Sequence, residues 1–150
     1  MSGLIGGAGA KSGIIGETEL EYEEVTWTPA MVGSSGSAGS WSMGGVEADY
    51  IRVGKLVYIT MYCYVANKGD YTGNLKVTGL PFANTGFANV TSLAVGGYPF
   101  NNTTNNYHGV IPGGQSFIRF MSGVYTETVM TMPDVYTGRG ISMTGFYHLA

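Results

Sequence analysis

The sequence predicts an all-β fold: an antiparallel β-sandwich of jelly-roll type, with an extended Gly-rich N-terminal arm. Three observations predict it. The chain has 25 glycines and 13% aromatic residues, and short aromatic and β-branched runs alternate with Gly-rich turns. No stretch has the hydrophobic period of a helix. Charged residues make up 11% and hydrophobic residues 44%, which is unlike the composition of a disordered chain.

Residues 1–24 are expected to form the arm, and residues 25–150 the sandwich domain. Ser2-Gly3-Leu4-Ile5-Gly6 recurs ten residues later as Ser12-Gly13-Ile14-Ile15-Gly16. Such a segment is too short and too rich in glycine to form a core or a helix. It is either a flexible tail or an arm held by a partner. We expect the arm, with partner contacts at Leu4, Ile5, Ile14 and Ile15.

Glutamates alternate with other residues from position 17 to position 23. In an extended strand, Glu17, Glu19, Glu21 and Glu23 share one face. Their carboxylates could meet a basic partner surface or a calcium ion. Alternatively, they mark a solvated edge strand that charge protects from aggregation. The pattern favours the edge strand slightly, and the four glutamates remain candidate partner contacts.

The next residues predict a strand, a loop and a hairpin. Residues 25–29 form a strand that ends at a proline, and residues 33–45 are nearly all Gly, Ser and Ala around one tryptophan, which predicts a loop. Residues 48–53 and 56–66 are strands joined by a compact turn at Gly54-Lys55.

The strand at residues 56–66 has two distinct faces. The face expected in the core carries Val57, Ile59, Met61, Cys63 and Val65. We expect Cys63 there to be a buried, inert thiol. Tyr58, Tyr62 and Tyr64 lie on the other face, and their apolar bodies with polar tips suit a surface that is buried on self-association. The alternative is the inner face of a second sheet layer.

Further strands are expected along the rest of the chain, at spacings typical of a sandwich. They cover residues 74–82, 87–95, 116–121, 124–132 and 141–149. The first of them ends in a Gly-Leu-Pro-Phe corner at 79–82, and residues 101–106 form a polar loop.

No motif for catalysis or for a cofactor is expected. A phosphate-binding loop needs glycine where Ile5 and Ala10 stand. His108 and His148 belong to no nucleophile signature. Glu47 and Asp49 project in parallel from one strand, whereas glycosidase carboxylates flank the substrate from opposite sides. The single cysteine excludes an internal disulfide and a Cys-based zinc site. We expect no enzymatic activity and no cofactor.

Charge and hydropathy exclude two further classes of partner. The net charge is −3, and the seven Lys and Arg residues are scattered, so nucleic-acid binding is not expected. No apolar run is long enough to span a membrane. The first residues lack the features of a signal peptide, so we expect synthesis in a cytoplasm. A surface with so few charges favours coverage by other protein chains.

Three segments carry a resemblance to a known family. They are Thr26-Trp27-Thr28-Pro29, Tyr50-Ile51-Arg52-Val53-Gly54-Lys55-Leu56-Val57 and Gly73-Asn74-Leu75-Lys76-Val77-Thr78-Gly79-Leu80-Pro81-Phe82. In this order they resemble a β-sandwich module of tailed-bacteriophage virion proteins, found in tail fibres and small capsid-associated proteins. The resemblance covers residues 17–150. Val25 departs from it, because the family usually has glycine there.

The resemblance implies a trimeric, non-enzymatic virion component. The expected function is a capsid decoration, or cement, protein: a homotrimer made in the host cytoplasm that clamps neighbouring subunits of the major capsid protein, or another virion protein, through its arm. The alternative is a tail-fibre module that recognises a host glycan or surface protein, with the loop at 101–107 and the aromatic residues Trp41 and Tyr98 as contacts.

Overall fold

The computed structural model describes residues 21–85, 91–97, 107–123, 128–131, 135 and 137–149, and these residues form strands and turns without a helix. Every strand pairing is antiparallel, so the expected all-β antiparallel fold is confirmed. The strands are β1 (Tyr22–Thr26), β2 (Ala30–Ser37), β3 (Ser42–Val53), β4 (Leu56–Asn67), β5 (Asp70–Thr78), β6 (Thr91–Gly97), β7 (Tyr107–Ile111), β8 (Ile118–Ser122), β9 (Thr128–Val129) and β10 (Gly140–His148).

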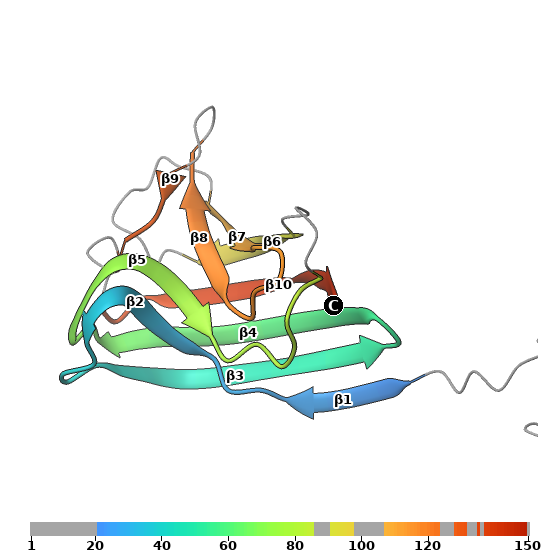
Figure 1. The fold of residues 1–150 in the computed structure, drawn as a ribbon. Helices are drawn as coiled ribbons and strands as arrows, with labels where there is room; N and C mark the ends of the chain where they lie inside the picture. The colour runs from blue at the N-terminus through green and yellow to red at the C-terminus, as the bar shows by residue number, and fades with distance from the viewer. Residues whose placement is uncertain are drawn as a thin grey trace, which may run out of the picture.

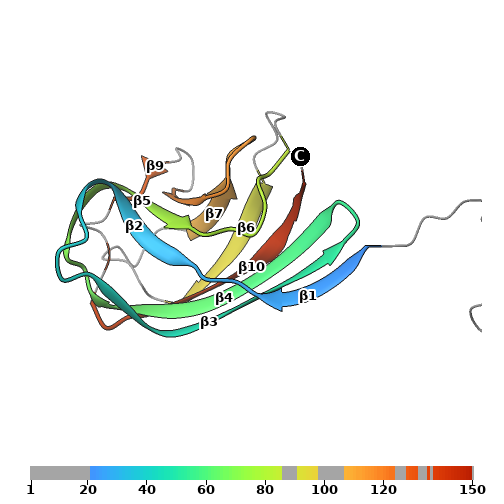
Figure 2. The same ribbon diagram turned by 60° about the horizontal axis from the view of Figure 1, so that its bottom comes forward.

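The strands form one curled sheet with the order β1-β3-β4-β10-β6-β7-β8-β5-β2, and β9 pairs with β8 (Figures 1 and 2). The edge strands β1 and β2 follow each other in the chain, separated only by residues 27–29. The curl therefore brings the two ends of the sheet toward each other. Because hydrogen-bonded pairing runs along the whole sheet, the expected two-sheet jelly-roll arrangement is not confirmed.

The core fills the inside of the curl. The face of β4 that was expected to be buried is buried at each position: Val57, Ile59, Met61, Cys63 and Val65. Leu75 and Val77 of β5 and Phe120 of β8 belong to the same cluster, from the other half of the sheet. Each fully buried large side chain contributes about 1.5–3 kcal/mol to folding.

The prediction of a loop over residues 33–45 is wrong. Residues up to Ser37 belong to β2, which pairs with β5, and β3 begins at Ser42, so the turn is confined to the four residues between them. Gly and Ser have low strand propensity, but propensity in sheets depends on the neighbouring strands. Here β2 gains its backbone partners from β5, with a bulge between Gly33 and Ser35.

Strand β1 crosses the boundary expected between the arm and the domain. Its residues Tyr22 to Thr26 pair continuously with Val53 to Asp49 of β3, so residues 22–24 are part of the sheet. Tyr98 and the loop at 101–106 lie outside the described residues. So do six of the expected partner contacts: Leu4, Ile5, Ile14, Ile15, Glu17 and Glu19.

The Gly-Leu-Pro-Phe corner packs inside the curl. Gly79 has a φ of +90°, and a Cβ at this position would lie 2.2 Å from the carbonyl oxygen of Thr28, so glycine is required there. The Phe82 ring meets the Tyr50 ring edge-on at 5.6 Å and lies 5.3 Å from the Arg52 guanidinium. The corner is thereby fixed against β3.

Asn84 fixes the segment after this corner. Its side chain is buried, and its Nδ2 donates to the carbonyl oxygen of Ile111 at 3.1 Å. Its backbone N–H donates to the carbonyl oxygen of Gln115 at 2.9 Å. Thr85 donates in turn to the carbonyl oxygen of His148, which ties the segment to the end of β10.

Candidate association surface

The tyrosine face of β4 points away from the core. Tyr62 is 44% exposed and Tyr64 is 38% exposed, while Tyr58 is half-buried. The neighbouring strands β3 and β10 pair with β4 along its length, and no layer of the described chain covers these tyrosines. The alternative that they form the inner face of a second layer is therefore excluded for the described residues.

Register places further apolar side chains on this outer face. Phe146 of β10 is paired with Tyr58, Val53 of β3 is paired with Leu56, and Tyr22 of β1 is paired with Val53. Phe146 is 54% exposed and Tyr22 is 61% exposed. We call the whole set the outer apolar patch; it comprises Tyr22, Ile51, Val53, Leu56, Tyr58, Tyr62, Tyr64 and Phe146.

One end of the patch is hollowed. Ile51, Val53, Leu56, Tyr58 and Phe146 line an open depression of about 240 Å³. The rings of Tyr58 and Phe146 pack at 4.8 Å, tilted by 44°, and form one wall. This depression, which we call the apolar groove, lies beside the β3–β4 turn and is wide enough for aliphatic side chains.

At the other end of the patch, two tyrosine rings lie across neighbouring strands. A Cβ on Gly44 would lie 2.3 Å from Cζ of Tyr64, and a Cβ on Gly140 would lie 2.8 Å from the hydroxyl oxygen of Tyr62. The rings therefore occupy space that only glycine leaves free. Each ring lies close to the sheet and keeps an exposed surface for a partner.

Between these two ends the outer face carries hydroxyl groups among apolar side chains. Thr60, Ser142 and Thr144 contribute hydroxyls to a shallow depression of about 480 Å³ that extends to β6. The Thr144 hydroxyl donates to the Tyr58 hydroxyl oxygen at 2.9 Å. Along β4, the outer face thus begins with the apolar groove, continues with the hydroxyls and ends with tyrosine rings.

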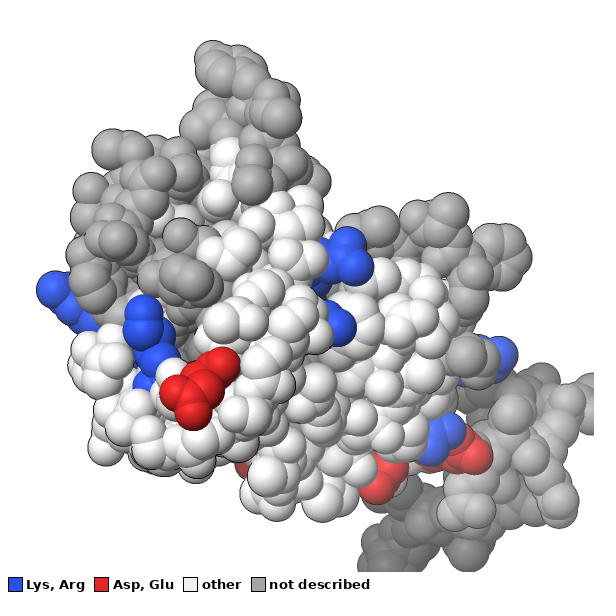
Figure 3. All heavy atoms as spheres, turned by 60° about the vertical axis from the view of Figure 1, so that its left-hand side comes forward, with Lys and Arg blue, Asp and Glu red and all other residues white. Residues whose placement is uncertain are grey.

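Three carboxylates lie along one side of this face. Asp49 is paired with Thr60, Glu47 with Tyr62, and Glu24 with Ile51, and all three carboxylates are exposed. Glu47 and Asp49 project from one face of β3, as expected from their spacing. Charged side chains are otherwise scattered, as Figure 3 shows for another side of the molecule.

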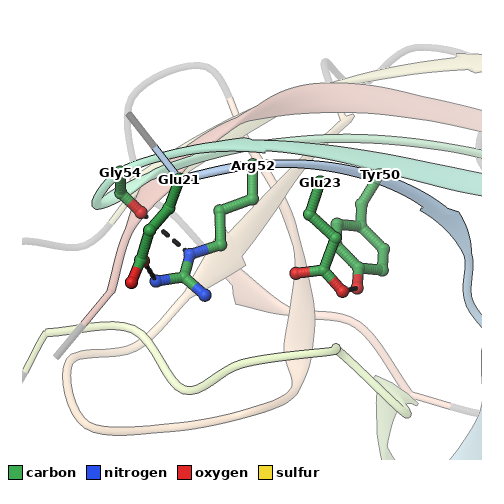
Figure 4. Close-up of polar contacts among 5 residues, drawn as sticks. All are labelled: Glu21, Glu23, Tyr50, Arg52 and Gly54. Carbon is green, nitrogen blue, oxygen red and sulfur yellow. Dashed lines mark hydrogen bonds and ion pairs between the residues drawn. The ribbon is translucent and has the colours of Figure 1, made fainter. Parts of the chain in front are cut away.

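Glu21, just before β1, and Glu23, within β1, both make contacts within the chain (Figure 4). Glu21 forms an ion pair with Arg52, whose Nε also donates to the carbonyl oxygen of Gly54 at 2.9 Å. The Tyr50 hydroxyl donates to Glu23 Oε1 at 2.5 Å, and this hydrogen bond raises the pKa of Tyr50. Because β1 is at the sheet edge, these contacts support the edge-strand interpretation for Glu21 and Glu23.

The remaining sites considered from the sequence are dispersed. Cys63 is buried, and its burial raises the pKa of its thiol to about 11. His108 is on β7 and His148 is at the end of β10. Within the described ranges, no three His, Cys, Asp or Glu residues are grouped to hold a metal ion, and no helix is long and apolar enough to cross a membrane.

No known protein family and no curated protein matches this sequence. Among solved structures, the crystal structure of the Dettilon tailspike protein has a similar fold, with a TM-score of 0.61 and 13% sequence identity. The match covers 85% of this chain and 24% of the tailspike chain. The fold is one that a tailspike contains. At this identity the similarity concerns the fold, and the chain spans about a quarter of the tailspike's length.

Sequence reasoning identified the three tyrosines of the patch but missed Phe146, Leu56 and Val53. One signal for Phe146 was available. It alternates with Ser142 and Thr144 on the polar side of β10, where a large aromatic ring is unexpected for a solvated face. The contacts among Val53, Leu56 and Phe146 depend on the register of three strands, which the sequence does not specify.

Proposed function

We propose that this chain is a non-enzymatic structural module of a bacteriophage virion that assembles as a homotrimer through its outer apolar patch. The observation that carries this proposal is the similarity of its fold to a tailspike protein over 85% of the chain. The three sequence segments that resemble phage virion modules support it; they are the connection from the end of β1 to β2, the β3–β4 hairpin, and β5 with its corner.

The outer apolar patch supports association rather than solvation. Large exposed side chains from four strands, among them Phe146, Tyr62 and Leu56, lie on one face. Large exposed apolar side chains gathered on one face in this way are typical of interaction sites in soluble proteins. Aromatic side chains are also enriched at the centres of such interfaces, where their burial contributes most to affinity.

The first candidate location is the phage tail, because the structural neighbour is a tailspike protein. There the module would be part of a fibre or spike, in keeping with the tail-fibre alternative expected from the sequence. Immunogold labelling of intact particles with an antibody against this chain tests this location. Label at the tail is the expected result, and particles without label would contradict the virion proposal as a whole.

Capsid decoration is the second candidate, favoured by the twin aliphatic pairs within residues 1–16. In this case the label would cover the shell, and the arm would clamp neighbouring capsid subunits. Deleting residues 2–16 should then abolish binding to particles that lack the protein, while circular dichroism of the folded domain stays unchanged. If the truncated chain decorates particles to the same occupancy, the clamp is ruled out.

A further inference from the structure

We propose that residues 4–15 of one copy bind along the outer apolar patch of a neighbouring copy. Ile14 and Ile15 occupy the apolar groove, and Leu4 and Ile5 contact the rings of Tyr62 and Tyr64. This inference rests on the proposed self-association and names the segment that covers the patch.

The residue pattern of the segment matches that of the outer face. The outer face changes from the apolar groove at Leu56, through hydroxyls at Thr60, to tyrosine rings ending at Tyr64. Residues 4–15 have two aliphatic pairs separated by a spacer of Gly, Ala, Ser and one Lys. The apolar parts of the segment thus correspond to the two apolar ends of the face, and its small, polar part corresponds to the hydroxyls.

The segment is long enough to reach both ends of the outer apolar patch. Leu56 and Tyr64 are eight residues apart in one strand, so they are separated by about 26 Å. Leu4 and Ile14 are ten residues apart and can span at most about 33 Å when extended. The segment can therefore reach both ends of the patch without full extension, as a glycine-rich backbone allows.

The charge of the segment also complements that of the outer face. Lys11 is the only charged side chain within residues 1–16. If Ile14 lies at the level of Tyr58, Lys11 is three residues further along, at the level of Thr60 and Tyr62. These two residues are paired with Asp49 and Glu47 of β3, whose carboxylates are exposed. The segment therefore places its cation beside the acidic side of the face.

The course of the chain favours a neighbouring copy over the same copy. β1 begins at Tyr22, which is paired with Val53 at the end of the sheet where the apolar groove lies. The alternating glutamates at 17–23 predict an extended chain that continues β1 past this end. Ile15 is seven residues before Tyr22, a separation of up to about 23 Å, so an extended chain would carry it past its own groove.

Binding of residues 4–15 to a neighbouring copy is a head-to-tail contact, since the arm of one copy meets a different surface on the next. Contacts of this type close into a ring when the rotation between copies allows it. A homotrimer is such a ring. Fixing the arm costs about 1–2 kcal/mol per residue in backbone entropy, which the preformed groove and rings must offset.

Cysteine cross-linking in the full-length chain tests the proposal. One preparation carries Ile15→Cys and a second carries Leu56→Cys; they are mixed, oxidised mildly and separated on a non-reducing gel. The native Cys63 is buried and gives little background. The matched control replaces Leu56→Cys by Asp70→Cys, which is exposed on β5, away from the patch. A second pair, Ile5→Cys with Tyr64→Cys, tests the other end.

We expect the Ile15→Cys and Leu56→Cys mixture to form disulfide-linked dimer in at least about tenfold greater yield than the control, because docking raises the effective concentration of the two thiols. A yield equal to the control at both ends would overturn the proposal. So would a link that forms only within single chains of the Ile15→Cys/Leu56→Cys double variant. Neither result bears on particle labelling, so failure here is distinguishable from failure of the proposed function.

Discussion

At the scale of single residues, Cys63 shows how burial in the core lowers the reactivity of a thiol. Its side chain lies on the inner face of β4 between Met61 and Val65, and burial raises the pKa of its thiol to about 11 from an ordinary value of 9.0. Thiolate is the reactive form, so this pKa leaves little of it at neutral pH.

We therefore predict that Cys63 reacts about 100-fold more slowly in the folded chain than in the unfolded chain at pH 8, from the pKa difference alone. The measurement is the rate of modification by a chromogenic thiol reagent, with and without denaturant. Comparable rates in the two conditions would show that the inner face of β4 is accessible.

Tyr147 provides a second residue-scale prediction, on the pH dependence of stability. Burial raises the pKa of Tyr147 to about 12 from 10.0. The folded state holds this proton more tightly than the unfolded state does. The protonated hydroxyl therefore contributes its full share of the free energy of unfolding below pH 10, and this share is lost as pH rises toward 12. Over this window the free energy of unfolding falls by about 1.4 kcal/mol for each pH unit. Cys63 contributes with the same sign from about pH 9 to 11.

Urea unfolding at pH 8 and pH 11 measures this effect. The Tyr147→Phe variant should lose less stability between the two pH values than the wild type, and Tyr71→Phe, on β5 outside the outer apolar patch, should behave like the wild type. An identical loss in all three proteins would contradict the assignment to Tyr147.

At the scale of elements, two glycines with positive φ offer a matched comparison. Gly79 (φ +90°) is in the corner, where a Cβ would clash with the backbone oxygen of Thr28. Gly54 (φ +58°) is in the β3–β4 turn, where a Cβ meets nothing within 4 Å. Both alanine substitutions incur the cost of the left-handed conformation, about 1–2 kcal/mol. Only the first also forces the backbone apart.

We predict that Gly79→Ala lowers the free energy of unfolding by about 1–3 kcal/mol more than Gly54→Ala does. Denaturant unfolding of the two variants under the same conditions gives the difference. Equal destabilisation would mean that the corner can move away from β1 and β2 at little cost.

The strands differ in how far the sequence predicts them, for a physical reason. The hairpin of β3 and β4 was predictable because Gly54 marks the turn and β4 alternates strictly between core and surface residues. Strand β2 was not, because its Gly and Ser residues carry no such pattern and depend on β5 for pairing. The curl of the sheet depends on the pairing of β5 with β8, which are distant in the chain.

The residues of the outer apolar patch also differ in whether the sequence predicts them. Tyr58, Tyr62 and Tyr64 are on one strand, so their common face follows from the period of a strand. Val53 and Phe146 join them through the pairings of β3 and β10 with β4, which no local pattern encodes. Their contribution to the groove became visible only with the register.

At the scale of the whole molecule, one curled sheet has a single inside. The core of the described chain fills that inside, so the outer face of β1, β3, β4 and β10 has no further layer among the described residues. A chain with 11% charged residues has few means of keeping such a face solvated. We therefore expect association through the outer apolar patch to be the central property of this chain.

Sedimentation velocity of the full-length chain tests that property most directly. We predict a wild-type mass three times that of the 15.8 kDa chain, and a monomer for the Leu56→Ser/Phe146→Ser variant, which keeps the core intact. Val25→Ser, an exposed apolar position on the opposite face of β1, is the control and should remain trimeric. A monomeric wild type, or a double variant that remains trimeric, would contradict association through this patch.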